Sequence, residues 1–408
     1  MTGTESTLLW IYAAIVAVWP IRFVVLKVIL GRQRFLDAQA PRYTAADPPS
    51  VTAILPAKDE ETYLSGCLAS VRAQTYPNLQ ILVVDDRSQD RTGVIAREHA
   101  EADPRVRVLT IQELPPGWTG KTHALFRAVA EAQGDWLWFL DADTLHAPES
   151  LSILMEYGRT EGAAMVSLLP ELRCETFWEK VVQPLGGIVL MQSFPLHTVH
   201  RDDSPLAFAN GQYILIRRDA YDAAGGHEAV KDRFVEDIAL ADRVKRKGYR
   251  IRVALIRGIV TCRMYASLGQ LVRGWSRILF DALDRRAIRL VWRLLDVLGF
   301  CQVGHVAVIA SLVLLAIGQD RRFAEILLGL GLVHHALMYL VFRQIYRTSV
   351  PGSRHTAWFP VGNAIIDVIL FRAIRMCLTG RVSWRDTQYG PSKAAPGRPE
   401  AVASRSDG

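Results

Sequence analysis

Two aspartates that follow a short apolar run are the residues of this chain best suited to metal chemistry. The run is Trp136–Leu140, and Asp141 and Asp143 come after it. Its length and aromatic content favour a buried β-strand over a helix. Carboxylates two positions apart at the end of a strand share a face, so they can bind one divalent cation. A cation held by one or two carboxylates keeps positions open for substrate phosphates, and the pair therefore predicts a metal and phosphate site.

Two other stretches carry side chains suited to related chemistry. The loop GWTGKT is not a Walker A motif, because Pro115 stands where that motif needs its first glycine. It still places Lys121 in the first turn of a predicted helix, where backbone N–H groups and an ammonium can meet a phosphate. Glu236 and Asp237 open a later predicted helix, and acids there suit the helix dipole without any function. Asp237 is also the unassigned carboxylate best placed to act as a general base.

These side chains need a scaffold that brings them together, and the chain alternates short apolar runs with helical patterns. Strands are predicted over 51–56, 79–86, 106–110, 136–140, 163–168, 211–218 and 251–256, and helices over 60–74, 89–100, 119–133, 219–224 and 236–247. The alternation predicts an α/β domain with a mostly parallel sheet covered on both faces. Ligands of such sheets bind at the carboxyl ends of the strands, where Asp86 and Asp141 both fall. Residues 174–210 show no regular pattern.

Three apolar segments are long enough to cross a bilayer: residues 8–30, 297–318 and 323–342. The first lacks the cleavage site of a secretory signal, so we expect a retained anchor. Basic residues follow it and fill the loop 343–355, which predicts an N-terminus outside and a cytoplasmic location for the chain that follows. A fourth apolar segment, 359–376, is interrupted by charged residues and either crosses the membrane or lies in its interface.

The charge distribution favours a membrane over nucleic acid as the partner surface. The chain has 408 residues, a net charge of +7 and 50% hydrophobic residues. Its basic residues gather beside the apolar segments, where they suit a membrane surface. Between residues 267 and 292, apolar residues recur at helical spacing beside arginines, which predicts either an interfacial helix or a helix packed on its own domain. The five cysteines lack metal-ligand spacing and indicate free thiols in a reducing compartment.

Seven motifs occur along the chain in order: ILPAKDEE, VVDDRSQDRT, GWTGK, FLDADT, GQYILIRR followed by GGH, FVEDIALADRVKRKGYR and MYASLGQLVRGWSR. Over about residues 51–283 they make the chain resemble a membrane-bound family 2 glycosyltransferase of the GT-A fold. It is most similar to bacterial enzymes that glycosylate lipids, carotenoids, hopanoids or ceramides. The resemblance implies six segments: an N-terminal transmembrane anchor (1–34), a linker (35–50), a GT-A catalytic domain (51–262), an amphipathic interfacial region (263–294), C-terminal transmembrane segments (295–378) and a partly disordered tail (379–408).

The same resemblance implies a site for the nucleotide part of a sugar donor. Pro56, Ala57 and Glu60 would border the uridine pocket. Asp86 would accept a hydrogen bond from the uracil, and Lys121 would lie beside the pyrophosphate.

Metal binding and catalysis follow from the remaining acids in the resemblance. Asp141 and Asp143 would hold Mg²⁺ or Mn²⁺ on the pyrophosphate. Asp237, with Glu236 beside it, would be the base of an inverting displacement. This is chemically coherent, because a metal neutralises the leaving group while a base activates the acceptor hydroxyl.

The stretch QLVRGW adds Arg273 and Trp275 as donor-binding candidates, since an arginine can stabilise a pyrophosphate and an indole can stack on a sugar. Processive synthases of the family carry a QxxRW box, whereas Gly274 separates the two residues here. The chain thus departs from the polymer-forming members. Lipid-glycosylating relatives often end in a WxGR-like box, of which Trp384 matches only the tryptophan.

The function implied is transfer of one sugar from a nucleotide-sugar donor, UDP-sugar favoured, to a membrane lipid hydroxyl. The protein would be a multi-pass cell-membrane enzyme with a cytoplasmic catalytic domain and no nucleic-acid partner. Alternatives are transfer to polyprenyl phosphate, polysaccharide synthesis, and a catalytically silent membrane protein that binds sugar nucleotides. The intact set of acids speaks against the silent protein.

Overall fold

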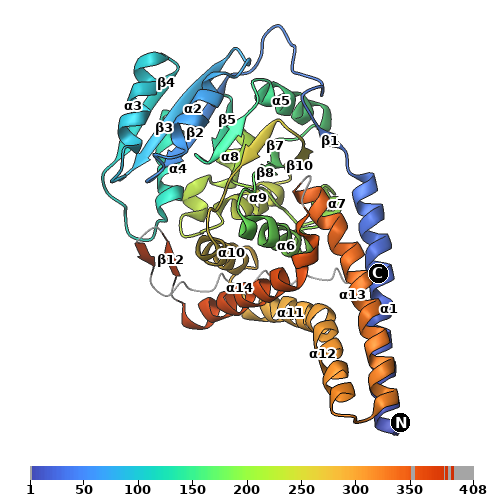
Figure 1. Ribbon diagram of the computed structural model, residues 1–408. Helices are drawn as coiled ribbons and strands as arrows, with labels where there is room; N and C mark the ends of the chain where they lie inside the picture. Colours follow the sequence, from blue (N-terminus) through green and yellow to red (C-terminus); the bar gives the residue numbers. More distant parts are fainter. Residues whose placement is uncertain (1, 351–353, 381, 385–386, 390–408) are drawn as a thin grey trace, which may run out of the picture.

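The computed structural model describes residues 2–350, 354–380, 382–384 and 387–389. An α/β domain stands on a group of long helices, and the N-terminus lies at the far end of that group (Figure 1). Helix α1 (Gly3–Arg32) runs from this end toward the domain. There β1 (Phe35–Leu36) joins the edge of the central sheet.

Eight strands form this sheet in the order β1-β10-β7-β9-β5-β2-β3-β4. All neighbours pair in parallel except β9, which is antiparallel to both β5 and β7. The mostly parallel sheet predicted from the sequence is confirmed. The strands after β1 are β2 (Val51–Ala57), β3 (Leu79–Asp86), β4 (Val106–Ile111), β5 (Trp136–Leu140), β7 (Met165–Leu169), β9 (Tyr213–Arg217) and β10 (Ile251–Ile256).

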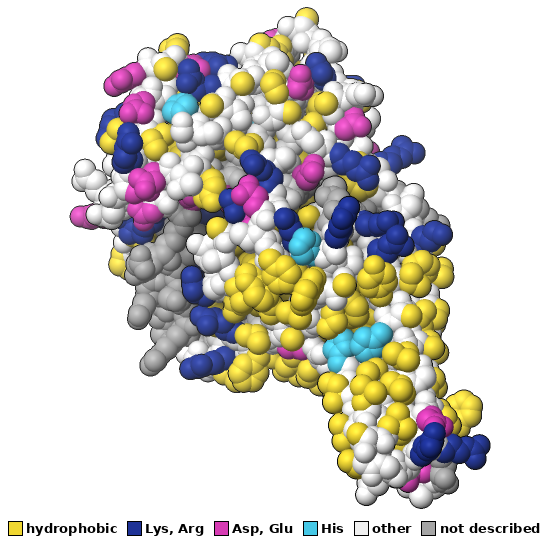
Figure 2. Space-filling model, in the orientation of Figure 1, with side chains coloured by type: hydrophobic (Ala, Val, Ile, Leu, Met, Phe, Trp, Pro, Cys, Tyr) yellow, Lys and Arg dark blue, Asp and Glu magenta, His cyan; other side chains and the backbone are white. Residues whose placement is uncertain are grey.

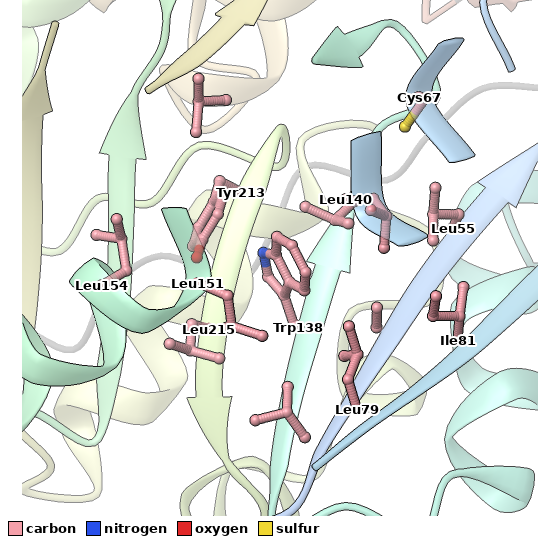
Figure 3. Packing of buried hydrophobic residues seen from close by; sticks show 14 of the residues in the cluster. Leu55, Cys67, Leu79, Ile81, Trp138, Leu140, Leu151, Leu154, Tyr213 and Leu215 are labelled. Atoms are coloured by element: carbon pink, nitrogen blue, oxygen red, sulfur yellow. The ribbon is translucent and has the colours of Figure 1, made fainter. Parts of the chain in front are cut away.

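Helices cover both faces of the sheet, as predicted. One face carries α2 (Leu64–Arg72), α3 (Thr92–Ala102) and α5 (Ser150–Glu161). The other carries α4 (Gly120–Glu131), α8 (Arg218–Ala224) and α9 (Glu236–Arg246). Because successive strand residues point to opposite faces, Trp138 packs in the first core and Phe139 in the second. Figure 3 shows Trp138 between Leu140 and Tyr213 in the first core.

The stretch 174–210, which shows no sequence pattern, contains α6 (Phe177–Ser193) and α7 (Leu196–Val199). Thr176 and Glu179 form a capping box at the start of α6, each side chain accepting the other's backbone N–H. Pro184 lies inside this helix. A proline inside a helix is unfavourable on sequence grounds, which explains why the sequence did not predict α6.

The apolar stripe over 267–292 forms two helices, α10 (Leu268–Ala282) and α11 (Ala287–Val297), where one was predicted. Asp284 and Arg285 separate them with left-handed φ values of 60° and 58°. Helix α10 is packed in a core with α6 and α14 (Phe359–Thr379). Helix α11 instead exposes apolar side chains, among them Ile288, Trp292 and Leu295.

Among the described residues, three helical segments are long and apolar enough to cross a membrane: Gly3–Gly31, Ala287–Ala316 and Arg321–Ser349. They contain or overlap the three predicted spans. The second consists of α11, the π-helix η2 (Leu298–Gln302) and α12 (Val303–Ala316), and the third is α13. The predicted fourth segment is α14, which follows η3 (His355–Trp358) and packs on α6, α10 and α11. In Figure 2 hydrophobic side chains cover the helix group, with Lys and Arg side chains gathered above them.

The end of the described chain forms a hairpin of β12 (Val382–Trp384) and β13 (Thr387–Tyr389). Trp384 therefore lies on a strand. The tail predicted to be disordered, residues 391–408, lies outside the described residues.

A hydrogen-bond chain ties three of the long helical segments together. The Tyr12 hydroxyl lies 3.0 Å from His334 Nδ1, and His334 Nε2 donates to the Phe300 carbonyl at 2.9 Å. His334 is fully buried. These two hydrogen bonds join α1, α13 and η2, and polar contacts of this kind stabilise helix pairs where no water competes.

Replacing His334 with leucine should lower the stability of the protein in detergent by about 1–2 kcal/mol, because both partners lose their hydrogen bonds. Tyr339→Phe, at an exposed position of the same helix, is the matched control and should change little. Thermal unfolding of the two variants in one detergent measures the difference. Equal midpoints would contradict a structural role for His334.

Candidate active site

The residues predicted to form the site all line one cavity, although they come from distant parts of the sequence. Its volume is about 2050 Å³, against roughly 300–1,000 Å³ for a typical ligand pocket. It therefore has room for more than one substrate. The predicted residues on its wall are Pro56, Ala57, Glu60, Asp86, Lys121, Asp141, Asp143, Glu236, Asp237, Arg273 and Trp275.

Lys121 holds the centre of the site. Its Nζ lies 2.7 Å from Asp141 Oδ1 and 2.8 Å from Glu236 Oε1. Burial alone lowers the pKa of Lys121, but the charges of Asp141 and Glu236 outweigh burial and raise the pKa above its ordinary value. The ammonium thus stays charged, and it joins the end of β5 to the start of α9.

The start of α4 fixes the position of Lys121. Thr119 caps the helix by accepting a hydrogen bond from the Thr122 N–H. A Cβ at Gly120 would lie 2.5 Å from Asp86 Oδ2, so only glycine lets the helix start so close to that carboxylate. Arg87 in turn donates two hydrogen bonds to Asp86, at 2.7 and 3.0 Å. The sequence analysis missed Arg87, which lies on the cavity wall with a φ of 59°.

Asp141 and Asp143 lie where β5 leads into β6 (Thr144–His146), which pairs with β11 (Val260–Cys262) in a small sheet with β8 (Glu171–Leu172). The Thr144 hydroxyl donates to the Asp141 carbonyl at 2.7 Å and fixes this turn. Burial, and then the charge of Asp141, raises the pKa of Asp143. Its Oδ1 is buried without a hydrogen-bond partner among the described residues.

A divalent cation fits these two carboxylates. A buried carboxylate oxygen without a donor gains most from a cation, and hard cations such as Mg²⁺ prefer oxygen ligands. No cluster of three or more His, Cys, Asp or Glu side chains suited to a metal occurs in the part of the chain that the structure describes. Asp141 and Asp143 would therefore supply two ligands and leave the remaining positions to phosphate and water.

Asp237 faces the same cavity from the start of α9. Its Oδ2 accepts the Gly211 N–H at 2.6 Å and its Oδ1 accepts the Ile238 N–H at 2.7 Å. Burial, and then the charge of Glu236, raises the pKa of Asp237. A Cβ at Gly211 would lie 2.9 Å from Lys121 Nζ and 3.1 Å from Asp237 Oδ2, so the backbone itself forms this wall. Gly211 belongs to a quoted motif, but the sequence analysis gave it no role.

Comparison with known proteins fits this geometry. Residues 52–225 match the family described as "Glycosyl transferase family 2". They form a family 2 glycosyltransferase domain.

An N-acetylglucosaminyltransferase of Sinorhizobium fredii is 31% identical, over 64% of this chain and 66% of its own. A 4,4'-diaponeurosporenoate glycosyltransferase of Staphylococcus haemolyticus is 28% identical, over 61% and 66%. The chain thus spans just under two thirds of these relatives. A mannosyltransferase from Pyrobaculum calidifontis, solved with GDP-Man and Mn²⁺, shares 19% identity at a TM-score of 0.49, over 91% of this chain and 99% of its own.

Two of the predicted donor-binding residues lie on α10. Arg273 is exposed, whereas Trp275 is only 4% exposed. The indole N–H of Trp275 donates to Gln183 at 2.7 Å, and a Cβ at Gly186 would lie 2.5 Å from its ring. Trp275 thus borders the cavity as part of the packing between α6 and α10.

A buried carboxylate that was not predicted from the sequence holds the loop that precedes Glu236 and Asp237. Asp281, near the end of α10, is fully buried. Its Oδ2 accepts the N–H groups of Phe234 and Val235 at 2.8 and 2.7 Å, and its Oδ1 accepts Arg285 Nε at 2.6 Å. Val235 directly precedes Glu236, so Asp281 fixes the entry of α9.

The other side of this loop is held by α4. The carbonyl of Lys231, which follows the short helix η1 (His227–Val230), accepts from the Thr119 N–H and from the Thr122 hydroxyl, both at 2.8 Å. One loop therefore connects α10 with the helix that carries Lys121. The sequence held one local signal for this anchor, since two acids and three arginines crowd residues 281–289.

Asp281→Asn should slow sugar transfer about 10²-fold, since the groups facing its oxygens are donors and an amide NH₂ would displace the loop. The nucleotide-sugar KM should change little. The free energy of unfolding should also fall, by about 3–5 kcal/mol, because Arg285 loses its buried partner. Asp284→Asn, at a half-exposed neighbouring acid, is the control. Normal kcat in a destabilised Asp281→Asn protein would limit Asp281 to a structural role.

Proposed function

We propose that the protein transfers a single sugar from a nucleotide-sugar donor, UDP-sugar favoured, to a hydroxyl of a membrane lipid, with inversion at the anomeric carbon. One observation carries this proposal. The cavity that contains Asp141, Asp143 and Asp237 also has residues of α1 and α13, two of the helices long enough to cross a membrane, in its wall.

The donor would lie along the carboxyl ends of β2, β3 and β5. Pro56, Ala57 and Glu60 would contact the nucleoside. The Asp86 carboxylate lies on the wall of the same cavity. The pyrophosphate would take the place between Lys121 and the aspartates that follow β5. Lys121 would then exchange part of its contact with Asp141 for the phosphate oxygens.

The chemistry needs one base on the far side of the sugar from the leaving group. Asp237 would remove the proton of the acceptor hydroxyl while that oxygen attacks the anomeric carbon and the bond to the nucleoside diphosphate breaks. Two backbone N–H groups hold its carboxylate. A bound Mg²⁺ or Mn²⁺ would neutralise the charge of the departing diphosphate.

The membrane orientation follows from charge. Lys27 and Arg34 flank the domain end of α1, whereas Glu5 is the only charged residue before position 22. An excess of basic residues marks the cytoplasmic side, so the glycosyltransferase domain would face the cytoplasm, where nucleotide sugars are made available.

Membranes that contain the protein should incorporate label from one radiolabelled nucleotide sugar into organic-soluble lipid, and EDTA should abolish it. Asp237→Asn should lower the rate by roughly 10²–10⁴-fold while donor binding persists, because a general base contributes about this factor. Asp242→Asn, which removes another acid of α9, should transfer normally. An acid-labile lipid product would point to polyprenyl phosphate, an insoluble polymer to a synthase, and no label anywhere to a silent binder.

The transfer rate should rise as the pH passes through about 7, rather than near the ordinary pKa of an aspartate. The pKa of Asp237 is raised to about 7 by burial and by Glu236, so below neutrality the carboxyl keeps its proton and cannot act as a base. A profile of kcat against pH, with donor binding measured at each pH, tests this. A rate that already reaches its plateau near pH 5 would contradict the assignment of Asp237 as base.

A further inference from the structure

The half of α1 that follows Pro20 is not packed like the half before it. The buried residues of α1 are Leu9, Tyr12, Val16 and Trp19, and all of them precede Pro20. None of the described side chains between Pro20 and the end of the helix is buried. The first half of α1 thus contributes buried residues to the helix group, whereas the second half contacts it through partly buried residues such as Phe23 and Leu26 and also lines a cavity.

The cavity that this half of α1 lines is the active-site cavity. Val25, Val28 and Ile29 line the cavity and are at the same time 50%, 45% and 41% exposed. A residue that lines a cavity and is also largely exposed marks its mouth. The mouth therefore opens on the surface of a helix long and apolar enough to cross a membrane.

We propose that the hydrocarbon part of the acceptor lipid binds in the part of the cavity lined by α1, α6 and α13, called the arm below. The lipid would enter it sideways from the bilayer, past the second half of α1. The proposal rests on the function proposed above and adds the place and the route of the acceptor. Residues of α1 and Asp237 line the same cavity. A hydroxyl at the head of the lipid would reach the base while its chain remains among apolar side chains.

The opposite walls of the arm are apolar. Their residues come from α6 and α13, and they include Leu185, Ile188, Met191, Phe342 and Ile345. Ile188 and Met191 are only partly buried, so apolar surface stands open in the cavity. A contiguous apolar surface inside a concave site marks a binding site for an apolar ligand.

An ion pair closes the arm within the first turn after Pro20. Arg22 of α1 lies 2.6 Å from Asp296 of α11, and both line the cavity. The guanidinium also lies 4.2 Å from the centre of the Phe300 ring. Charges among membrane helices are stable only when paired, so this contact holds α1 to the helix group below the mouth. Between Arg22 and the end of α1, no ion pair joins α1 to α11 among the described residues. The mouth lies along this part of α1.

Binding can be tested separately from catalysis with a long-chain alcohol that carries a diazirine and an alkyne. The probe is added to the full-length protein in nanodiscs, irradiated, and mapped by mass spectrometry. The wild type should carry cross-links on peptides of α6 and of the second half of α1. Val25→Trp, which fills the mouth, should reduce the α6 cross-links about tenfold. Val24→Trp, at an exposed position of the same helix that does not line the cavity, should leave them unchanged.

Transfer provides the second measurement. Val25→Trp should lower kcat/KM for the membrane acceptor about tenfold and leave nucleotide-sugar binding unchanged, and Val24→Trp should behave as wild type. Equal cross-linking on α6 in both variants, or cross-links confined to the outer face of α1, would overturn the route. If the wild type forms no glycolipid, the proposed function fails on its own. If it forms glycolipid and both variants transfer equally well, only the route fails.

Discussion

The active site depends on one buried ammonium among several carboxylates. Lys121 contacts Asp141 and Glu236 directly, and the charge of Asp237 also raises its pKa. Carboxylates gathered in a poorly solvated place repel one another unless a cation balances them. Burial is the main cause of the raised pKa values of Asp143 and Asp237, and the charges of Asp141 and Glu236 raise them further, because one ammonium does not balance all of the carboxylates. The remaining negative charge is what a divalent cation at one end, and the proton of an acceptor hydroxyl at the other, would take up.

The direction of a single strand makes this gathering possible. Parallel strands bring only their carboxyl ends to the edge where Asp141 lies. Because β9 runs antiparallel to β5, with Leu140 opposite Tyr213, the residues that precede β9 reach the same edge. Gly211 thereby comes within hydrogen-bond distance of Asp237. A parallel β9 would have put this glycine at the opposite edge and left Asp237 without this backbone donor.

Much of the fold and the polar end of the site could be predicted, because both depend on local patterns. Apolar runs such as Trp136–Leu140 identify strands, and acids at their ends identify the ligand edge. The direction of β9 could not be read, since an apolar run looks the same both ways. Helix α6 was hidden by Pro184, which is tolerated here because the surrounding packing outweighs local propensity.

Contacts between distant segments also could not be predicted from the sequence. The charge-rich stretch 281–289 does not by itself distinguish Asp281 from a solvated acid at a helix end, because the burial of Asp281 depends on where residues 232–235 lie in space. The same holds for Trp275. Its arginine neighbour and its place in a quoted motif indicate a ligand contact, while the structure also gives the indole N–H a partner in Gln183. Residue types predict which chemistry is available, and packing decides which side chains remain free for it.

Helix α10 links the long apolar helices to the edge of the sheet that carries Asp141. On one side it packs with α6 and α14 above the apolar helices. On the other its Asp281 holds the loop that begins α9 and touches the start of α4. A tilt of α10 relative to the sheet would therefore move Glu236, Asp237 and the anchor of Lys121 together. For the proposed lipid acceptor, this connection would set the depth of Asp237 relative to the bilayer, which would have to match the position of the lipid hydroxyl.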